Sequence, residues 1–122
     1  MIPRRLAVAA LLAAAGWSMP ANAGPMVDLA IHDAIVGGDY QKAERVLQPR
    51  FAAGERSPEL MLNLAAVYVL TNRSEAARPL YLAVLGEPDV AMDASRQEGD
   101  VVSAHAVARA GLRRIEIVTA QR

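Results

Sequence analysis

The stretch VGGDYQKAERVL, residues 36–47, places two glycines and an aspartate between two runs of helix-forming residues. Glycine adopts positive φ angles at little cost, so Gly37 and Gly38 are expected to end a first helix. Aspartate is a preferred N-cap residue, so Asp39 is expected to begin a second helix directly afterwards. The stretch therefore predicts a helix, a tight turn and another helix.

A second copy of this arrangement follows farther along the chain. Ser57 is a candidate N-cap, and Pro58 suits the first helical position, where its missing N–H is not needed. Apolar residues then recur at i, i+3, i+4 and i+7, namely Met61, Leu64, Ala65 and Tyr68. Residues 71–74 break this pattern, and another helix is expected over about 75–85.

A fixed step of 34 residues, which is the separation of Gly38 from Asn72, relates the two copies. At this step a turn residue meets a turn residue, and Ala43 falls on Ala77. Small side chains at Ala43 and Ala77 are expected to let the two helices of each hairpin approach closely. The other matched pairs are apolar: Val27 with Met61, Ala30 with Leu64, Ile31 with Ala65, Ala34 with Tyr68, and Leu47 with Tyr81. A fixed period of this kind is typical of repeat proteins.

With this period and these residues, the chain resembles the tetratricopeptide repeat (TPR) family, whose unit has the same length. The resemblance covers about residues 24–91, as two repeats at about 24–57 and 58–91. The residues that carry it are Gly38, Asp39, Tyr40, Ala43, Leu64, Ala65, Tyr68, Ala77 and Tyr81. It implies an all-α fold in which antiparallel helix–turn–helix repeats stack into a TPR-like α-solenoid.

Two prolines depart from a regular repeat, and one alternative fold has to be considered. Pro49 and Pro79 fall inside the second helices, where each removes a backbone hydrogen bond and is expected to kink or shorten its helix. An ordinary antiparallel helical bundle is the alternative fold, because it also combines apolar helices with glycine turns. The matched small residues at a fixed period favour repeats over such a bundle.

The remaining residues do not continue the period. Residues 92–102, within DVAMDASRQEGDVV, form either a loop or a small β-hairpin, and the loop is favoured. Behind Ser103, apolar residues return at helical spacing: Ala104, Val107, Ala108, Gly111, Leu112 and Ile115. Residues 103–122 are therefore expected to form a C-terminal helix that caps the stack, with a frayed tail from Ile115 onward.

Residues 1–23 have the pattern of a secretory signal peptide. Arg4 and Arg5 are followed by an apolar stretch over 6–17, and Ala21-Asn22-Ala23 provides a small-residue cleavage site after Ala23. The mature protein is therefore expected to be periplasmic or secreted, with no membrane span after cleavage. An uncleaved amphipathic anchor is the alternative, and the export route stays open. The chain has no cysteine for lipid attachment or disulfides.

The charge balance argues against nucleic acid as a partner. Removal of Arg4 and Arg5 leaves 11 basic residues against 13 acidic ones, a formal net charge of −2. No basic surface is therefore indicated. Aromatic residues make up only 4% of the chain, so few are present to stack on bases.

The sequence offers no catalytic centre and implies no cofactor. Asp28 and His32 are four residues apart on one helix and can share a proton or a metal ion. Two ligands do not complete a zinc site, and His105 lies about two helices away. A solvated helix face is the favoured interpretation. The family resemblance places Asp28 and His32 on the first-helix face where the family's peptide clamps carry basic and amide residues. A clamp of that kind is therefore not expected, although both residues are partner-binding candidates.

Two further sets of residues are candidates for partner binding. Leu62, Ala66 and Val69 form a second apolar stripe on one helix, to be covered by neighbouring helices or by a partner peptide. Cover by neighbouring helices is favoured. Arg109 and Arg113, four residues apart, can hold a carboxylate or phosphate, or simply solubilise the last helix.

These features together predict a non-catalytic periplasmic scaffold of TPR-like repeats, which presents a helical surface to another envelope protein or peptide. A structural module that associates with itself as a homodimer is the alternative, because repeat arrays generally need about three units for stability and this chain has two with a capping helix. An enzyme would require further residues to complete the pair Asp28 and His32.

Overall fold

The computed structural model describes residues 24–93 and 101–121, so the predicted signal peptide lies outside the described residues. Contacts divide the chain into two units, Met1–Ala30 and Ile31–Arg122, and of the first only the beginning of a helix is described. The described chain is mostly helical, with a single pair of short strands. The prediction of an all-α fold is confirmed.

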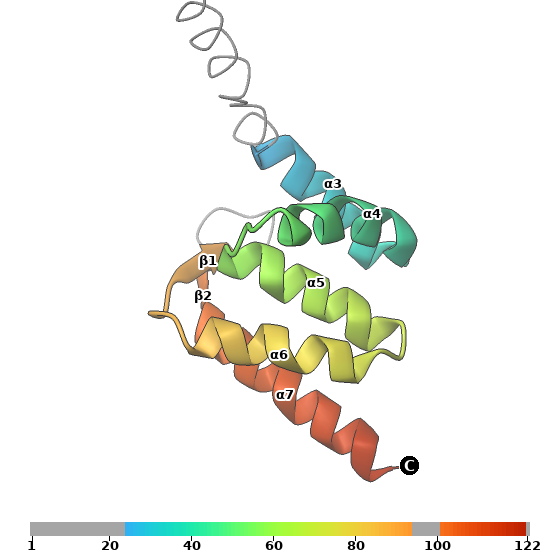
Figure 1. Ribbon diagram of the computed structural model, residues 1–122, viewed down its shortest axis with the longest axis vertical. Coiled ribbons are helices and arrows are strands. Elements are labelled where there is room, and N and C mark those ends of the chain that lie inside the picture. The colour runs from blue at the N-terminus through green and yellow to red at the C-terminus, as the bar shows by residue number, and fades with distance from the viewer. Residues whose placement is uncertain (1–23, 94–100, 122) are drawn as a thin grey trace, which may run out of the picture. The chain divides into compact units, whose positions relative to one another are not determined.

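Helices α4 to α7 follow one another in space in the order of the sequence (Figure 1). Helix α5 packs against α4, α6 and α7, and α6 packs against α7. The bounds of the elements are α3 Gly24–Val36, α4 Tyr40–Ala52, α5 Pro58–Leu70, α6 Ser74–Leu85, β1 Ala91–Asp93, β2 Val101–Ser103 and α7 Ala104–Ala120.

The turns after α3 and α5 have the same geometry and lie one period apart in the sequence. Gly38 and Asn72 both lie in the left-handed region, with φ of 84° and 61°. In each turn, two backbone N–H groups bond back to the last turn of the helix, as in a Schellman motif. The matched bonds are Gly38 N to Ile35 O and Asn72 N to Val69 O at 3.2 Å, and Asp39 N to Ala34 O and Arg73 N to Tyr68 O at 2.7 Å. The period seen in the sequence is thus repeated in the backbone.

Side-chain caps begin three of the helices. Asp39 Oδ1 accepts a hydrogen bond from Lys42 N at 3.2 Å, which confirms the predicted cap of α4. Ser57 caps α5 in the same way, as predicted, and Ser103 caps α7. The predicted end of the first helix is confirmed, because α3 ends at Val36, but only Gly38 of the two glycines has the positive φ that was expected of both. A Schellman turn needs one left-handed residue, and Gly38 supplies it.

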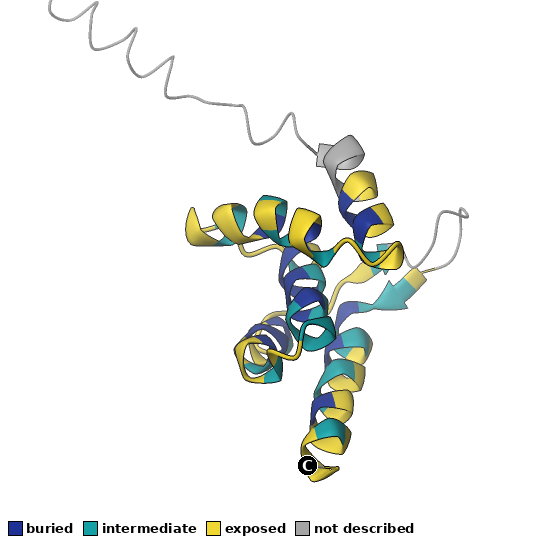
Figure 2. Cartoon of the chain, turned by 90° about the vertical axis from the view of Figure 1, so that its right-hand side faces the viewer, coloured by how far each residue is buried: buried dark blue, intermediate teal, exposed yellow. Residues whose placement is uncertain are grey.

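Helix α5 forms the centre of the core in the unit that begins at Ile31. It is apolar apart from Glu59 and Asn63 and is covered by the helices around it, as the buried residues along it show (Figure 2). Its buried residues are Leu60, Met61, Leu62, Leu64, Ala65 and Val67. Ala43, Ala65 and Ala77 have no exposed surface, and Leu47 and Tyr81 are buried beside them. Tyr68 is only half-buried.

Neither proline shortens its helix. Pro49 and Pro79 lie inside α4 and α6, which continue to Ala52 and Leu85. Each proline lacks one N–H, but the helix around it is held by tertiary packing. In α6 this packing includes Leu80 and further buried residues beyond the proline. The expected shortening is therefore not observed.

Two further expectations at the C-terminal end are wrong. Strands β1 and β2 pair antiparallel, with Met92 opposite Val102, so a hairpin replaces the favoured loop; residues 94–100 lie outside the described part. Helix α7 runs to Ala120, so the tail predicted to fray is helical. The reason is burial: Ile115 has no exposed surface and anchors the second half of the helix.

Candidate interaction surface

The apolar stripe predicted on α5 is mostly covered within the chain. Leu62 is only 6% exposed, and Ala66 and Val69 are half-buried. The cover comes from the helices packed around α5. Leu62 is therefore corrected from a partner-binding candidate to a core residue, while Ala66 and Val69 retain some accessible surface.

The predicted pair of Asp28 and His32 is described only in part. His32 is exposed, whereas the side chain of Asp28 lies outside the described residues. Among the described residues, no three His, Asp or Glu side chains gather closely enough to hold a metal ion. His32 is thus a surface residue.

Helix α7 carries the arginines that the sequence singled out, on the side away from the core. Arg109 and Arg113 are exposed, whereas Ala108 and Ile115 have no exposed surface. Arg114 is also exposed and Ile117 keeps 59% of its surface, and neither residue was among the predicted partner-binding residues. Ile117 could have been predicted from helical spacing, because it lies four residues after Arg113 and so on the same side of the helix. Sequence reasoning treated residues after Ile115 as a tail and so missed Ile117.

The N-terminal end of α7 is held by a hydrogen-bond cluster that fixes its position. Asp89 accepts from the Ser103 hydroxyl at 2.6 Å and from His105 N at 3.0 Å. Two hydrogen bonds lower the pKa of Asp89: the bond from Ser103 has the larger effect, and the bond from His105 N has the next largest. The His105 Nε2 atom lies 2.7 Å from the Glu87 carbonyl oxygen, so the ring bonds to backbone and not to Ser103. The serine and histidine therefore do not form a nucleophile and base.

An ion pair ties α4 to the turn before α6. The Arg73 guanidinium donates to both carboxylate oxygens of Glu44, with Nη1 3.0 Å from Oε2. It also lies 4.8 Å from the centre of the Tyr68 ring and donates to Thr71 Oγ1. The hydrogen bond from Arg73 lowers the pKa of Glu44. Arg73 thus links the two helix–turn–helix segments.

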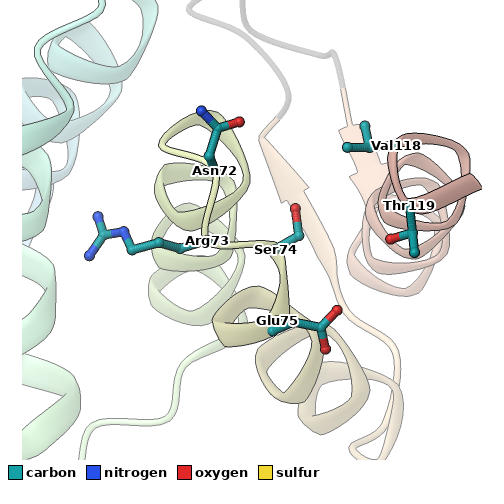
Figure 3. A pocket seen from close by; sticks show the side chains of 6 residues that line it. All are labelled: Asn72, Arg73, Ser74, Glu75, Val118 and Thr119. Atoms are coloured by element: carbon teal, nitrogen blue, oxygen red, sulfur yellow. The ribbon is translucent and has the colours of Figure 1, made fainter. Parts of the chain in front are cut away.

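A small hollow lies between residues 72–75, where α6 begins, and the end of α7 (Figure 3). Its volume is about 100 Å³, and Val118 and Thr119 line its far side. Arg73 points away from Thr119, whereas Glu75 brings a carboxylate to the hollow. The space suits a few water molecules, and the carboxylate disfavours an anion there. We assign no ligand to this hollow.

Comparisons of the chain with protein-family models, with curated proteins and with solved structures find no significant match. Within the described residues, no helix combines the length and apolar content needed to cross a bilayer. Of the predicted partner-binding residues whose side chains are described, His32, Arg109 and Arg113 are exposed, and Ala66 and Val69 are half-buried.

Proposed function

We propose that the protein is a non-catalytic protein–protein interaction scaffold, built from two TPR-like repeats and a capping helix and exported to the periplasm or beyond. The observation that carries the proposal is the matched pair of turns, in which Gly38 and Asn72 adopt the same left-handed conformation one period apart. Identical turns at a fixed separation are typical of repeat arrays.

The order of packing also supports a repeat array. The extensive helix contacts join helices that are one or two positions apart in the chain, as when α5 packs against α4, α6 and α7. Contacts restricted to near neighbours are characteristic of solenoids, where each unit touches only the next. Under this proposal, residues 24–57 and 58–91 are the two repeats and α7 caps the second.

The absence of an assembled reaction centre among the described side chains favours a binding role. The Ser103 hydroxyl and the His105 ring are engaged in holding the start of α7. Export is supported by the charged, apolar and small-residue segments of residues 1–23. The exposed side of α7 is the surface that we propose meets the partner.

Site-specific photocrosslinking in bacterial cells tests this function. The full chain, with its leader, is expressed with a photoreactive residue at Ala110, which is exposed on α7, or at Gln41 on α4 as a control. We expect a processed chain that begins after Ala23, and a discrete adduct with another envelope protein from position 110 but not 41.

Two outcomes would contradict the proposal. An unprocessed chain in the cytoplasm would exclude the exported role, and no adduct from any exposed position of α7 would exclude the scaffold. An adduct that contains only two copies of this chain would instead favour the self-associating module. Mass spectrometry of the adduct distinguishes these results.

A further inference from the structure

One face of α7 combines unpaired positive charge with an exposed apolar side chain. Arg109, Arg113 and Ile117 follow each other at i, i+4 and i+8, one helical turn apart, and Arg114 flanks them. We call these four residues the arginine ridge. Residues spaced by four form the ridges that fit into the grooves of a packed helix.

The guanidinium groups of the arginine ridge have no ion-pair partner in the described part of the chain. Three other arginines of the described chain are paired, namely Arg50 with Glu55, Arg73 with Glu44, and Arg78 with Glu75, whereas Arg45 and Arg56 form no ion pair there. Helix α7 contains three arginines and a single acidic residue, Glu116. The ridge is therefore a local positive surface on a chain of nearly balanced charge.

Three other occupants fit this surface less well. A bilayer would meet a single large exposed apolar residue, Ile117, because the opposite side of α7 is buried against the protein. Nucleic acid would find no aromatic residue on α7 for stacking. A second copy of α7 would bring like charges together, since each copy carries three arginines against one glutamate.

We propose that the arginine ridge is the docking surface for an acidic amphipathic helix of a partner protein. Carboxylates spaced by one turn on that helix pair with Arg109 and Arg113, and an adjacent apolar side chain covers Ile117. Helices cover the apolar faces elsewhere in this fold, as α4, α6 and α7 do for α5, so a helix is the fitting shape. This inference rests on the proposed scaffold function and names the partner's chemistry.

Binding of synthetic peptides to the mature protein tests the proposal. The probe is a fluorescent helical peptide with glutamates four residues apart beside a row of leucines. Matched peptides replace the glutamates with glutamine or lysine. We expect the glutamate peptide to bind, with an affinity that falls as salt rises, and the glutamine peptide to bind at least about tenfold more weakly.

Charge reversal on the protein locates the site. The double variant Arg109→Glu with Arg113→Glu is expected to bind the glutamate peptide at least about tenfold more weakly than the parent protein does. It is also expected to bind the lysine peptide, which the parent does not. Lys42→Glu with Arg45→Glu, on exposed positions of α4, changes the net charge equally and is expected to leave both affinities unchanged. The arginines are exposed, so melting temperatures of both variants should match the parent.

Several results would overturn the proposal. If both double variants bind the glutamate peptide equally weakly, the attraction depends only on the net charge of the protein. If the parent binds the glutamate and glutamine peptides with equal affinity, the protein does not recognise the carboxylates. Stronger binding to anionic vesicles than to the peptide would assign the ridge to lipid. A dimer in light scattering that Arg109→Glu dissociates would assign it to a second copy. A partner crosslinked from α7 whose capture survives both reversals would leave the scaffold standing and reject the ridge.

Discussion

Replacement of Gly111 by alanine tests how closely α6 and α7 approach. A Cβ atom at Gly111 would lie 2.6 Å from both Cε atoms of Tyr81, and closer still to Cζ. Carbon atoms are at their best separation at about 3.5–4.0 Å, so the methyl group overlaps the ring by roughly 1 Å. Tyr81 is 5% exposed and has little room to move away.

Two opposing terms set the magnitude of this effect. Alanine in place of glycine inside a helix stabilises it by about 1 kcal/mol. Overpacking of a filled core costs about 1–3 kcal/mol. We therefore expect Gly111→Ala to lower the free energy of unfolding by up to about 2 kcal/mol, with a loss of about 4–8 °C in melting temperature for each kcal/mol.

A second background makes the test sharper, because the sign of the effect should reverse. Tyr81→Leu keeps an apolar side chain but removes Cζ and both Cε atoms, so in that background Gly111→Ala should stabilise the protein by about 1 kcal/mol. Urea unfolding followed by circular dichroism measures all four proteins. Ala110→Gly, at an exposed position of the same helix, calibrates the glycine effect. Equal stabilisation by Gly111→Ala in both backgrounds would refute the close contact.

Three further predictions concern other parts of the fold. Leu62→Ala should cost about 2–5 kcal/mol in urea unfolding because the residue is buried, whereas Leu82→Ala, at a site 53% exposed, should stay within about 0.5 kcal/mol. Asp89→Asn should lower the melting temperature at pH 7. The folded-state pKa of Asp89 is below its ordinary 3.8, so its stabilising effect is fully present above 3.8 and is lost as the pH falls through the lower folded pKa. The difference in melting temperature between parent and variant should therefore shrink as the pH is lowered below 3.8. Glu44→Gln should cost at most about 1 kcal/mol by loss of the pair with Arg73, and the difference should shrink in about 1 M salt if the pair is electrostatic.

Features set by neighbouring residues were predictable from the sequence. Asp39 and Ser57 accept hydrogen bonds from N–H groups three residues ahead, and both were predicted as caps. The left-handed Gly38 follows from the same local chemistry. Such signals depend on a few adjacent residues, which a single sequence contains in full.

Features that join distant residues were not predictable. The hairpin depends on Asp89 holding Ser103 and His105, which lie 14 and 16 residues away, because three-residue strands carry little signal of their own. The pairing of Arg73 with Glu44 spans 29 residues. At the candidate surface, the arginines were found from their spacing, but the burial of Leu62 depends on which helices surround α5, and spacing alone does not reveal this.

The position of Arg73 has a consequence for how the protein melts. Arg73 occupies the N-cap of α6 but gives no side-chain hydrogen bond there, in contrast to Asp39 at the matching place before α4. Its guanidinium reaches Glu44 in the preceding segment instead. Helix α6 thus begins without a side-chain cap, and the residue at that position links the second helix–turn–helix segment to the first. Because α4 also packs against α5, the two segments share buried surface as well as this ion pair, and we expect them to melt in one cooperative transition.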